Sequence, residues 1–280
     1  MATQNATTHS NQLRDLVDSE IGVNPTEETK IADWVAQPVG AEKIGNTLYL
    51  RKLAEATANT ATPVTNGVAS SLTMNSAAHE RVSGSAVMKY SGYEIEDSLL
   101  TRVIDDGPYR AGLNKQGMAS IKKAIDYAVF TLASGLSHSQ AGAAIDDGML
   151  RAALGQLDLY AMNEVDDDTP KLLVIHPTQY ANALNIPALK EYQIRGTAGG
   201  AVSGKLNAYG ITMRRSGNVY WNGTTYFNPL ILKRAFALAW NIKPRVKPTQ
   251  YDGLVERLIF QTEFAALEWY DQFGVSLNIT

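Results

Sequence analysis

Between Ala54 and Ala86 the chain reads AEATANTATPVTNGVASSLTMNSAAHERVSGSA. Its large apolar residues fall on even positions among Thr, Ser, Asn and Ala, which is the period-two pattern of a strand with one modestly apolar face. Near the middle stands Asn66-Gly67, the dipeptide that most strongly indicates a tight hairpin turn. The stretch therefore predicts a long two-stranded arm.

We expect the base of this hairpin to pair residues 48–50 with residues 87–90. A two-stranded arm of this length is at best marginally stable alone in water, so an ordered arm must lie against something else. The most obvious support is another copy of the same chain. We therefore predict intersubunit contacts by the apolar residues of the arm and by one tryptophan that precedes it: Val64, Val68, Leu72, Met74 and Trp34.

The composition limits what the chain can do. With 280 residues, 45% of them hydrophobic, it can bury a sizeable core. A net charge of -3, with acidic and basic residues spread along the sequence, lacks the basic footprint of a tight nucleic-acid binder and leaves only weak, non-specific contact with nucleic acid. The chain has no cysteine, which excludes disulfides and thiolate chemistry, and no run approaches bilayer-crossing length, so no membrane partner is expected.

Helices and strands are mixed along the chain without regular alternation, which indicates an α+β fold. Residues 1–44 are expected to form an extended arm anchored by Trp34. A long amphipathic helix is predicted at about 115–134 and a second one after Asp147. The apolar run 171–175 predicts a buried strand followed by a helix from Thr178 to about Asn185, with Pro177 suited to its first turn. Further strands are expected at 211–214, 219–221 and 236–240, and from 255 to 279 with an interruption at Gly274.

The best enzyme signal is the loop from Gly199 to Lys205, which matches the phosphate-loop pattern until Leu206 replaces the Ser or Thr that would hold magnesium. A segment without strand character precedes it, so nucleotide binding is the less favoured alternative. The four histidines lack metal-site spacing, and the Asp pairs lack the spacing of a calcium loop and are better explained as turns and helix caps. We expect no catalytic residue, no metal and no cofactor.

Three strings resemble segments of one known family. Residues 173–180, LVIHPTQY, look like a strand-to-helix entry, residues 230–238, ILKRAFAL with a preceding Leu, look like a late strand, and residues 87–93, VMKYSGY, look like the end of an extended loop. Together with the order of elements, they make the chain similar to the major capsid proteins of tailed bacteriophages, the Hong Kong 97 type capsid fold that encapsulins share.

The resemblance implies an N-terminal arm at 1–44, an extended β-hairpin loop at 45–92, a peripheral domain at 93–140 and 241–280 with a spine helix at about 115–134, and an axial domain at 141–240. It implies a structural protein and not an enzyme: pentamers and hexamers would form an icosahedral shell around double-stranded DNA in the virion, after assembly in the host cytoplasm. Portal and scaffolding proteins are the expected partners, with a cement protein as a further candidate. Some members crosslink lysine to asparagine, and the sequence identifies no such pair.

Within the fold, the alternative is an encapsulin-like nanocompartment; outside it, a nucleotide-binding enzyme that uses the Gly199–Lys205 loop. The arm hypothesis predicts that deleting Thr57 to Ser83 leaves a folded subunit that does not assemble.

Overall fold

The computed structural model describes residues 29–38, 41–53, 79–96, 106–160, 169–186, 206–208, 210–251 and 255–280. Within these residues the strands form three sheets, accompanied by three α-helices, so the predicted α+β class is confirmed.

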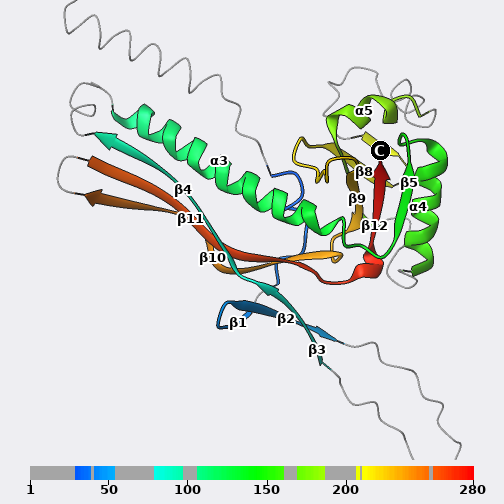
Figure 1. Cartoon of the computed structure of the whole chain (residues 1–280), viewed down its shortest axis with the longest axis horizontal. Helices are drawn as coiled ribbons and strands as arrows, with labels where there is room; N and C mark the ends of the chain where they lie inside the picture. Colours follow the sequence, from blue (N-terminus) through cyan, green and yellow to red (C-terminus); the bar gives the residue numbers. More distant parts are fainter. Residues whose placement is uncertain are drawn as a thin grey trace, which may run out of the picture.

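A long antiparallel sheet has the order β10-β11-β4, with β10 at Phe236–Tyr251, β11 at Val255–Glu268 and β4 at Val87–Glu96. Helix α3, Asp106–Leu132, lies along this sheet (Figure 1). Phe260 and Phe264 of β11 share a buried cluster with Ile121 and Ile125 of α3. A Cβ added to Gly117 of α3 would lie 2.3 Å from the Phe260 ring, so helix and sheet are in direct contact there.

The second sheet has six strands in the order β5-β12-β9-β6-β8-β7. These are β5 at Ser139–Gly142, β12 at Gly274–Ile279, β9 at Tyr226–Leu232, β6 at Lys171–Ile175, β8 at Ile211–Arg215 and β7 at Leu206–Ala208. Every residue of β6 is buried, as expected for a strand covered on both faces. Helices α4, Asp147–Tyr160, and α5, Pro177–Ala183, accompany this sheet (Figure 1).

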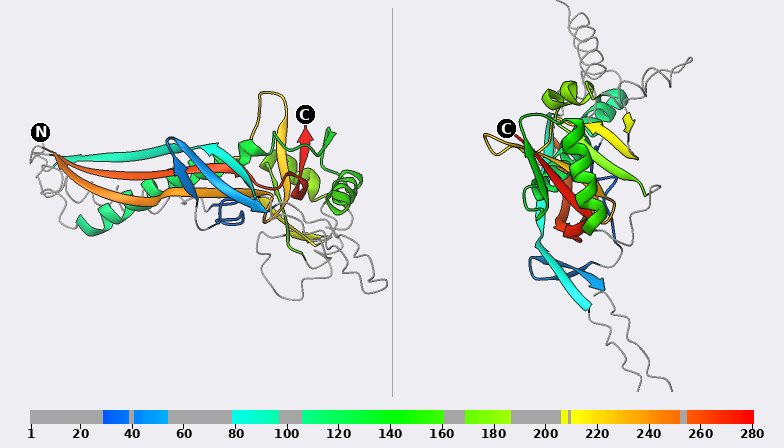
Figure 2. Two further views of the ribbon diagram at one scale, coloured as in Figure 1. Left: turned by 90° about the horizontal axis from the view of Figure 1, so that it is seen from below. Right: turned by 90° about the vertical axis from the view of Figure 1, so that its right-hand side faces the viewer.

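The third sheet is small, with the order β1-β2-β3: β1 at Glu42–Ile44, β2 at Thr47–Leu53 and β3 at His79–Ser85. Strands β2 and β3 pair antiparallel from Thr47 opposite Ser85 to Leu53 opposite His79. The right-hand view of Figure 2 shows this pair leaving the rest of the molecule.

Two local predictions in the compact part are confirmed. The buried strand at 171–175 is β6. The helix expected from Thr178 to about Asn185 is α5, which begins one residue earlier at Pro177 and ends at Ala183, with His176 as the N-cap residue. The second helix begins at Asp147, and Asp146 caps it, because its Oδ1 accepts the backbone N–H of Met149 at 2.7 Å.

The base of the hairpin was predicted wrongly. Leu48 pairs with Gly84 and Leu50 with Val82, whereas residues 87–90 start β4 and pair with β11. Ala86 is buried between β3 and β4, and the chain passes there from the small sheet to the long one. Residues 87–92, assigned to the extended loop at 45–92, therefore lie in the long sheet.

Other boundaries also differ from expectation. Helix α3 starts at Asp106 and not near 115, with Pro108 in its first turn, where the missing N–H breaks no helical hydrogen bond. Residues 219–221 form no strand beyond one isolated bridge from Trp221 to Tyr226. The interruption before the last strand is the 3-10 helix η1 at Asp271–Phe273, and Gly274 is already the first residue of β12.

The predicted grouping of 241–280 does not hold for β12, which pairs with β5 and β9 in the six-stranded sheet. Strands β11 and β12 have the same apolar alternation, and alternation does not reveal which sheet a strand joins.

Candidate assembly interface

Strands β2 and β3 form the base of the predicted arm, and we call them its root. They pack against the face of the long sheet opposite α3. Residues of β10 and β11 alternate, so that their phenylalanines join the cluster under α3 while three alanines and Leu267 face the other way. Leu48 and Leu50 of β2 are almost fully buried on this second face. The seat consists of the buried residues that pack together there: Ala36, Leu48, Leu50, Ala86, Ala237, Ala239, Ala265 and Leu267.

Small side chains make the close approach in the seat feasible. A Cβ added to Gly84 of β3 would lie 2.4 Å from Leu267 Cδ2 and 3.5 Å from Ala265 Cβ. The backbone of β3 therefore passes directly over β11. A larger residue at 265 would lift the hairpin from the sheet.

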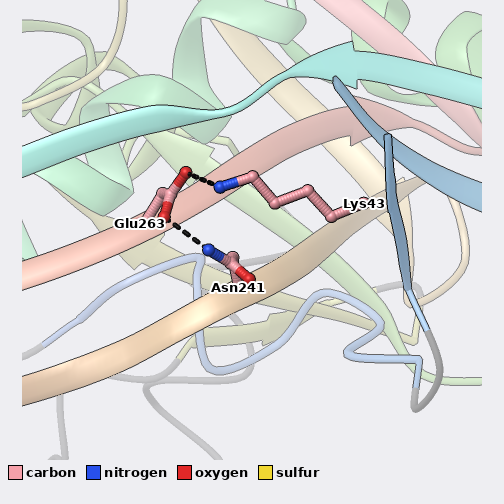
Figure 3. A network of polar contacts seen from close by, with 3 residues as sticks. All are labelled: Lys43, Asn241 and Glu263. Atoms are coloured by element: carbon pink, nitrogen blue, oxygen red, sulfur yellow. Dashed lines mark hydrogen bonds and ion pairs between the residues drawn. The ribbon is translucent and has the colours of Figure 1, made fainter. Parts of the chain in front are cut away.

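A polar network fixes the edge of the seat (Figure 3). Glu263 of β11 is only 6% exposed, and its Oε1 lies 2.5 Å from the Nζ of Lys43 in β1. Asn241 Nδ2 of β10 donates to the other carboxylate oxygen at 2.5 Å. The hydrogen bonds from Lys43 and Asn241 lower the pKa of Glu263, which keeps the carboxylate ionised. The buried charge thus has a cation and an amide as partners, and it connects β1 to β10 and β11.

Residues 30–32, which precede the small sheet, are hydrogen-bonded to a buried carboxylate of α3. Asp126 of α3 is 1% exposed and accepts the backbone N–H groups of Lys30 at 2.6 Å, Ile31 at 3.4 Å and Ala32 at 2.9 Å. These are the free amides at the start of the turn at 31–35, so Asp126 caps this turn from a distant element. Burial raises the pKa of Asp126, although the three amides oppose that rise.

Trp34 contacts residues of its own chain. It packs against the main core, half-buried, and the Arg214 guanidinium lies 5.9 Å from the centre of its ring. Trp34 therefore anchors the N-terminal segment, and its predicted intersubunit contact stays a prediction. The other predicted contacts, Val64, Val68, Leu72 and Met74, and the loop from Gly199 to Lys205 lie outside the described residues.

Large apolar side chains are exposed around the root of the arm. We call Ile44, Met88 and Tyr90 the root patch; they are 51%, 57% and 79% exposed. They belong to β1 and β4, and β4 is an edge strand of the long sheet. An apolar group of this kind beside an edge strand is a feature of interaction surfaces.

Sequence reasoning missed the polar network. Its signal is Glu263, a charged residue in a strand whose other residues from Leu258 to Leu267 carry no charge. A charge on a buried strand face requires a partner, but nothing local in the sequence indicates Lys43, because the two residues are far apart in the chain.

Clusters of metal ligands and membrane-spanning helices are absent from the part of the chain that the structure describes. Within it there is no group of three or more metal-ligating side chains, and no helix there is both long and apolar enough to span a bilayer. Ser137, in the segment that follows α3, donates its backbone N–H to Asp271 Oδ1 at 2.9 Å.

No family model matches the chain, and no curated protein matches it in sequence. Solved structures do match. The capsid of cyanophage P-SCSP1u is similar with a TM-score of 0.65 and 13% identity, over 92% of this chain and 90% of that one. A structure of Mycobacterium phage Che8 gives a TM-score of 0.63 and 16% identity, covering 91% and 92%.

A virus-like particle from Pyrococcus furiosus is also similar, with a TM-score of 0.55 and 10% identity over 95% of this chain and 98% of that one. The chain therefore has the fold of phage capsid proteins, and the predicted Hong Kong 97 type fold is confirmed.

Proposed function

We propose that the chain is the major capsid protein of a tailed double-stranded DNA bacteriophage and that its function is self-assembly into an icosahedral head. The observation that carries the proposal is the fold similarity to phage capsids, which covers about nine-tenths of both chains in the P-SCSP1u comparison. A similarity that spans the whole fold favours the same kind of shell subunit over a shared module in an unrelated protein.

The root of the arm supports this proposal. Leu53 and His79 are paired, so the strands that enter and leave residues 54–78 lie side by side and point away from the body. A hairpin of that length does not bury enough apolar surface by itself. A neighbouring subunit would supply the missing surface, with Val64, Val68, Leu72 and Met74 on the contacting face.

Assembly through many weak contacts accounts for the small apolar contact surfaces and the low net charge of the chain. Each arm and root patch contributes a modest energy, and closure of pentamers and hexamers by symmetry adds these energies into a stable shell. The net charge of -3 suits a shell whose contact with packaged DNA is weak and non-specific. The role is structural and not enzymatic, its location is the virion after assembly in the host cytoplasm, and portal and scaffolding proteins complete the head, with a cement protein as an optional addition.

A nanocompartment shell is the second candidate, favoured by the similarity to the Pyrococcus furiosus particle. The two functions differ in content. Purified particles that protect double-stranded DNA from nuclease support the phage head, whereas particles that contain protein cargo and no DNA support the nanocompartment.

The arm gives the direct test of assembly. The deletion from Thr57 to Ser83 would remove part of β3, so a sharper variant replaces residues 54–78 with Asn-Gly, which closes the hairpin just beyond the Leu53–His79 pair. We expect the shortened chain to keep the circular dichroism spectrum of the full chain and to form no closed shells in negative-stain micrographs.

A matched control keeps the length of the arm and changes only its apolar face, with Val64, Val68, Leu72 and Met74 all replaced by Ser. Loss of shells in both variants supports contact through that face. Normal shells from the shortened chain would overturn the role of the arm.

A further inference from the structure

Three connections join the long sheet and α3 to the six-stranded sheet. Residues 133–138 lead from α3 to β5, residues 233–235 from β9 to β10, and residues 269–273 from β11 to β12. Figure 1 shows that the last of these lies where the long strands meet the compact part. Any change in the angle between the two sheets must act on these connections.

The three connections are hydrogen-bonded to one another. The backbone N–H groups of Trp269 and Tyr270 both donate to the carbonyl of Ala235, at 2.9 and 3.2 Å. The carbonyl of His138 accepts from Ser276 at 2.9 Å, and the N–H of Ser137 donates to Asp271 Oδ1 at the same distance. The connections therefore form one junction, in which Asp271 is the side chain that links two of them.

A second carboxyl group lies beside Asp271. Glu268 is the last residue of β11, and its side chain is hydrogen-bonded to that of Asp271. A Cβ added to Gly135 would lie 3.4 Å from Glu268 Oε2, so this carboxyl group packs against the turn that follows α3. Two carboxyl groups form such a hydrogen bond only when one of them carries a proton.

We propose that Glu268 and Asp271 share one proton at this junction, and that its loss loosens the attachment of α3 to the six-stranded sheet. Glu268 donates the shared proton and Asp271 accepts it while also accepting the Ser137 N–H. When the proton is lost to solvent, two carboxylates lie side by side. Their repulsion acts on residues 133–138, the connection that includes Ser137.

The charges around the pair agree with this assignment. Burial raises the pKa of Glu268 to about 7, with the hydrogen bond to Asp271 and the charge of Asp271 adding to the rise. Burial also raises the pKa of Asp271, but hydrogen bonds from Ser137 and Glu268 and the charge of His138 outweigh it and lower the pKa overall.

The neighbouring elements contribute few other charges. These are His138 on the connection from α3, Lys233 and Arg234 on the connection between β9 and β10, and Asp158 on α4. Of these, His138 is the one whose charge acts on Asp271.

The direction of the pH effect follows from Glu268. Its pKa is higher in the folded protein than the ordinary value of 4.5, so folding favours the protonated form. The stability of the junction is therefore greatest below about pH 4.5 as far as this group is concerned, and it falls as the pH rises toward 7. The loss is complete once the pH has risen through the folded pKa, by about pH 8.

Hydrogen exchange of the full-length protein tests the proposal. After correction for intrinsic exchange, we expect the protection of the Ser137 and Phe273 amides to fall on the order of tenfold between about pH 6 and about pH 8. Glu268→Gln, which cannot ionise, should remove this fall, whereas Glu42→Gln on exposed β1 should retain it.

His138→Gln tests whether the histidine, and not the carboxyl pair, causes the pH dependence. The fall in amide protection should remain in this variant. A pH dependence that survives Glu268→Gln, or that disappears with His138→Gln, would overturn the proposal. The wild-type protein offers an independent measurement: a protonated-carboxyl infrared band should persist at about pH 6 and vanish by about pH 8, and its absence at the lower pH would contradict the shared proton.

Discussion

One face of the long sheet buries phenylalanines, whereas the other buries mainly alanines together with Leu267. Under α3, Phe260 and Phe264 are fully buried in the main core. On the opposite face, Ala237, Ala239 and Ala265 receive the hairpin root, and the buried Glu263 is paired with Lys43. The first face builds the body of the subunit, whereas the second is a shallow seat for a projecting element.

The energies of the two faces differ accordingly. Burial of a Phe or Leu side chain is worth roughly 1.5–3 kcal/mol, and many such residues meet under α3. In the seat, most of the apolar gain comes from Leu48, Leu50 and Leu267, and the ion pair adds a small amount because Lys43 is one-third exposed. We infer that the hairpin root is able to shift while the core beneath α3 stays intact.

The largest expected effect is on the α3 face. Phe260→Ala leaves a cavity beside Gly117 and Ile121, and we expect it to lower the free energy of unfolding by about 3–5 kcal/mol in urea titrations. The half-buried neighbour Ile259, on the opposite face, serves as the control and should cost clearly less on change to Ala. Equal losses at both positions would remove the distinction between the faces.

A smaller effect is expected from overpacking the seat. Ala265→Leu places extra atoms where β3 crosses β11 and should cost about 1–3 kcal/mol. Trypsin cleavage after Arg51 or Arg81 should become faster, because the displaced hairpin exposes its backbone. Ala265→Ser, which nearly conserves volume, should behave more like the unchanged protein. Unchanged cleavage in the Leu variant would show that the seat is not closely packed.

Removing the ion pair should have a still smaller effect. Lys43→Met retains the aliphatic stem and should cost about 1 kcal/mol, and a double-mutant cycle with Glu263→Gln should give a coupling energy of similar size. Because the pKa of Glu263 is lowered, its contribution is present above about pH 4.5 and is lost as the pH falls through the lowered value. Lys43→Met should therefore lose less stability on acidification, and an identical acid profile would argue against the pair.

The smallest effect on folding belongs to the root patch. Tyr90→Ser should change the free energy of unfolding by less than about 0.5 kcal/mol, because Tyr90 is 79% exposed. Shell yield, measured by sedimentation, should nevertheless fall if the patch contacts a neighbour. Tyr90→Phe keeps the apolar surface and should assemble normally. Equal yields from the two variants would exclude the patch from the interface.

Local patterns in the sequence were enough to predict strand β6, the start of α4 and the presence of α5 with Pro177 in its first turn. The apolar run at 171–175 and the Pro177 signal lie within a few residues of the structure they determine. The order of such elements, together with short strings, also led to the capsid fold. That fold is confirmed by structural similarity at 10–16% identity, where sequence matching alone finds nothing.

Long-range pairing is what the sequence did not reveal. The base of the hairpin was assigned to residues 87–90, because these residues alternate as well as Val82 and its neighbours do. The choice between them depends on the buried Ala86 and on the edge of β11 with which β4 pairs, and both are set by the folded chain. In the same way, the Lys43–Glu263 pair and the cap from Asp126 to the turn at 31–35 join segments that are distant in sequence.

The central claim is that the hairpin root serves an arm that joins copies of this chain. Negative-stain microscopy of the purified full-length protein, at concentrations that favour assembly, tests it most directly. We predict closed shells of uniform size built from the full chain, and open or absent shells when residues 54–78 are replaced by Asn-Gly. A full-length protein that stays monomeric under all such conditions, with expected partners supplied, would contradict the account.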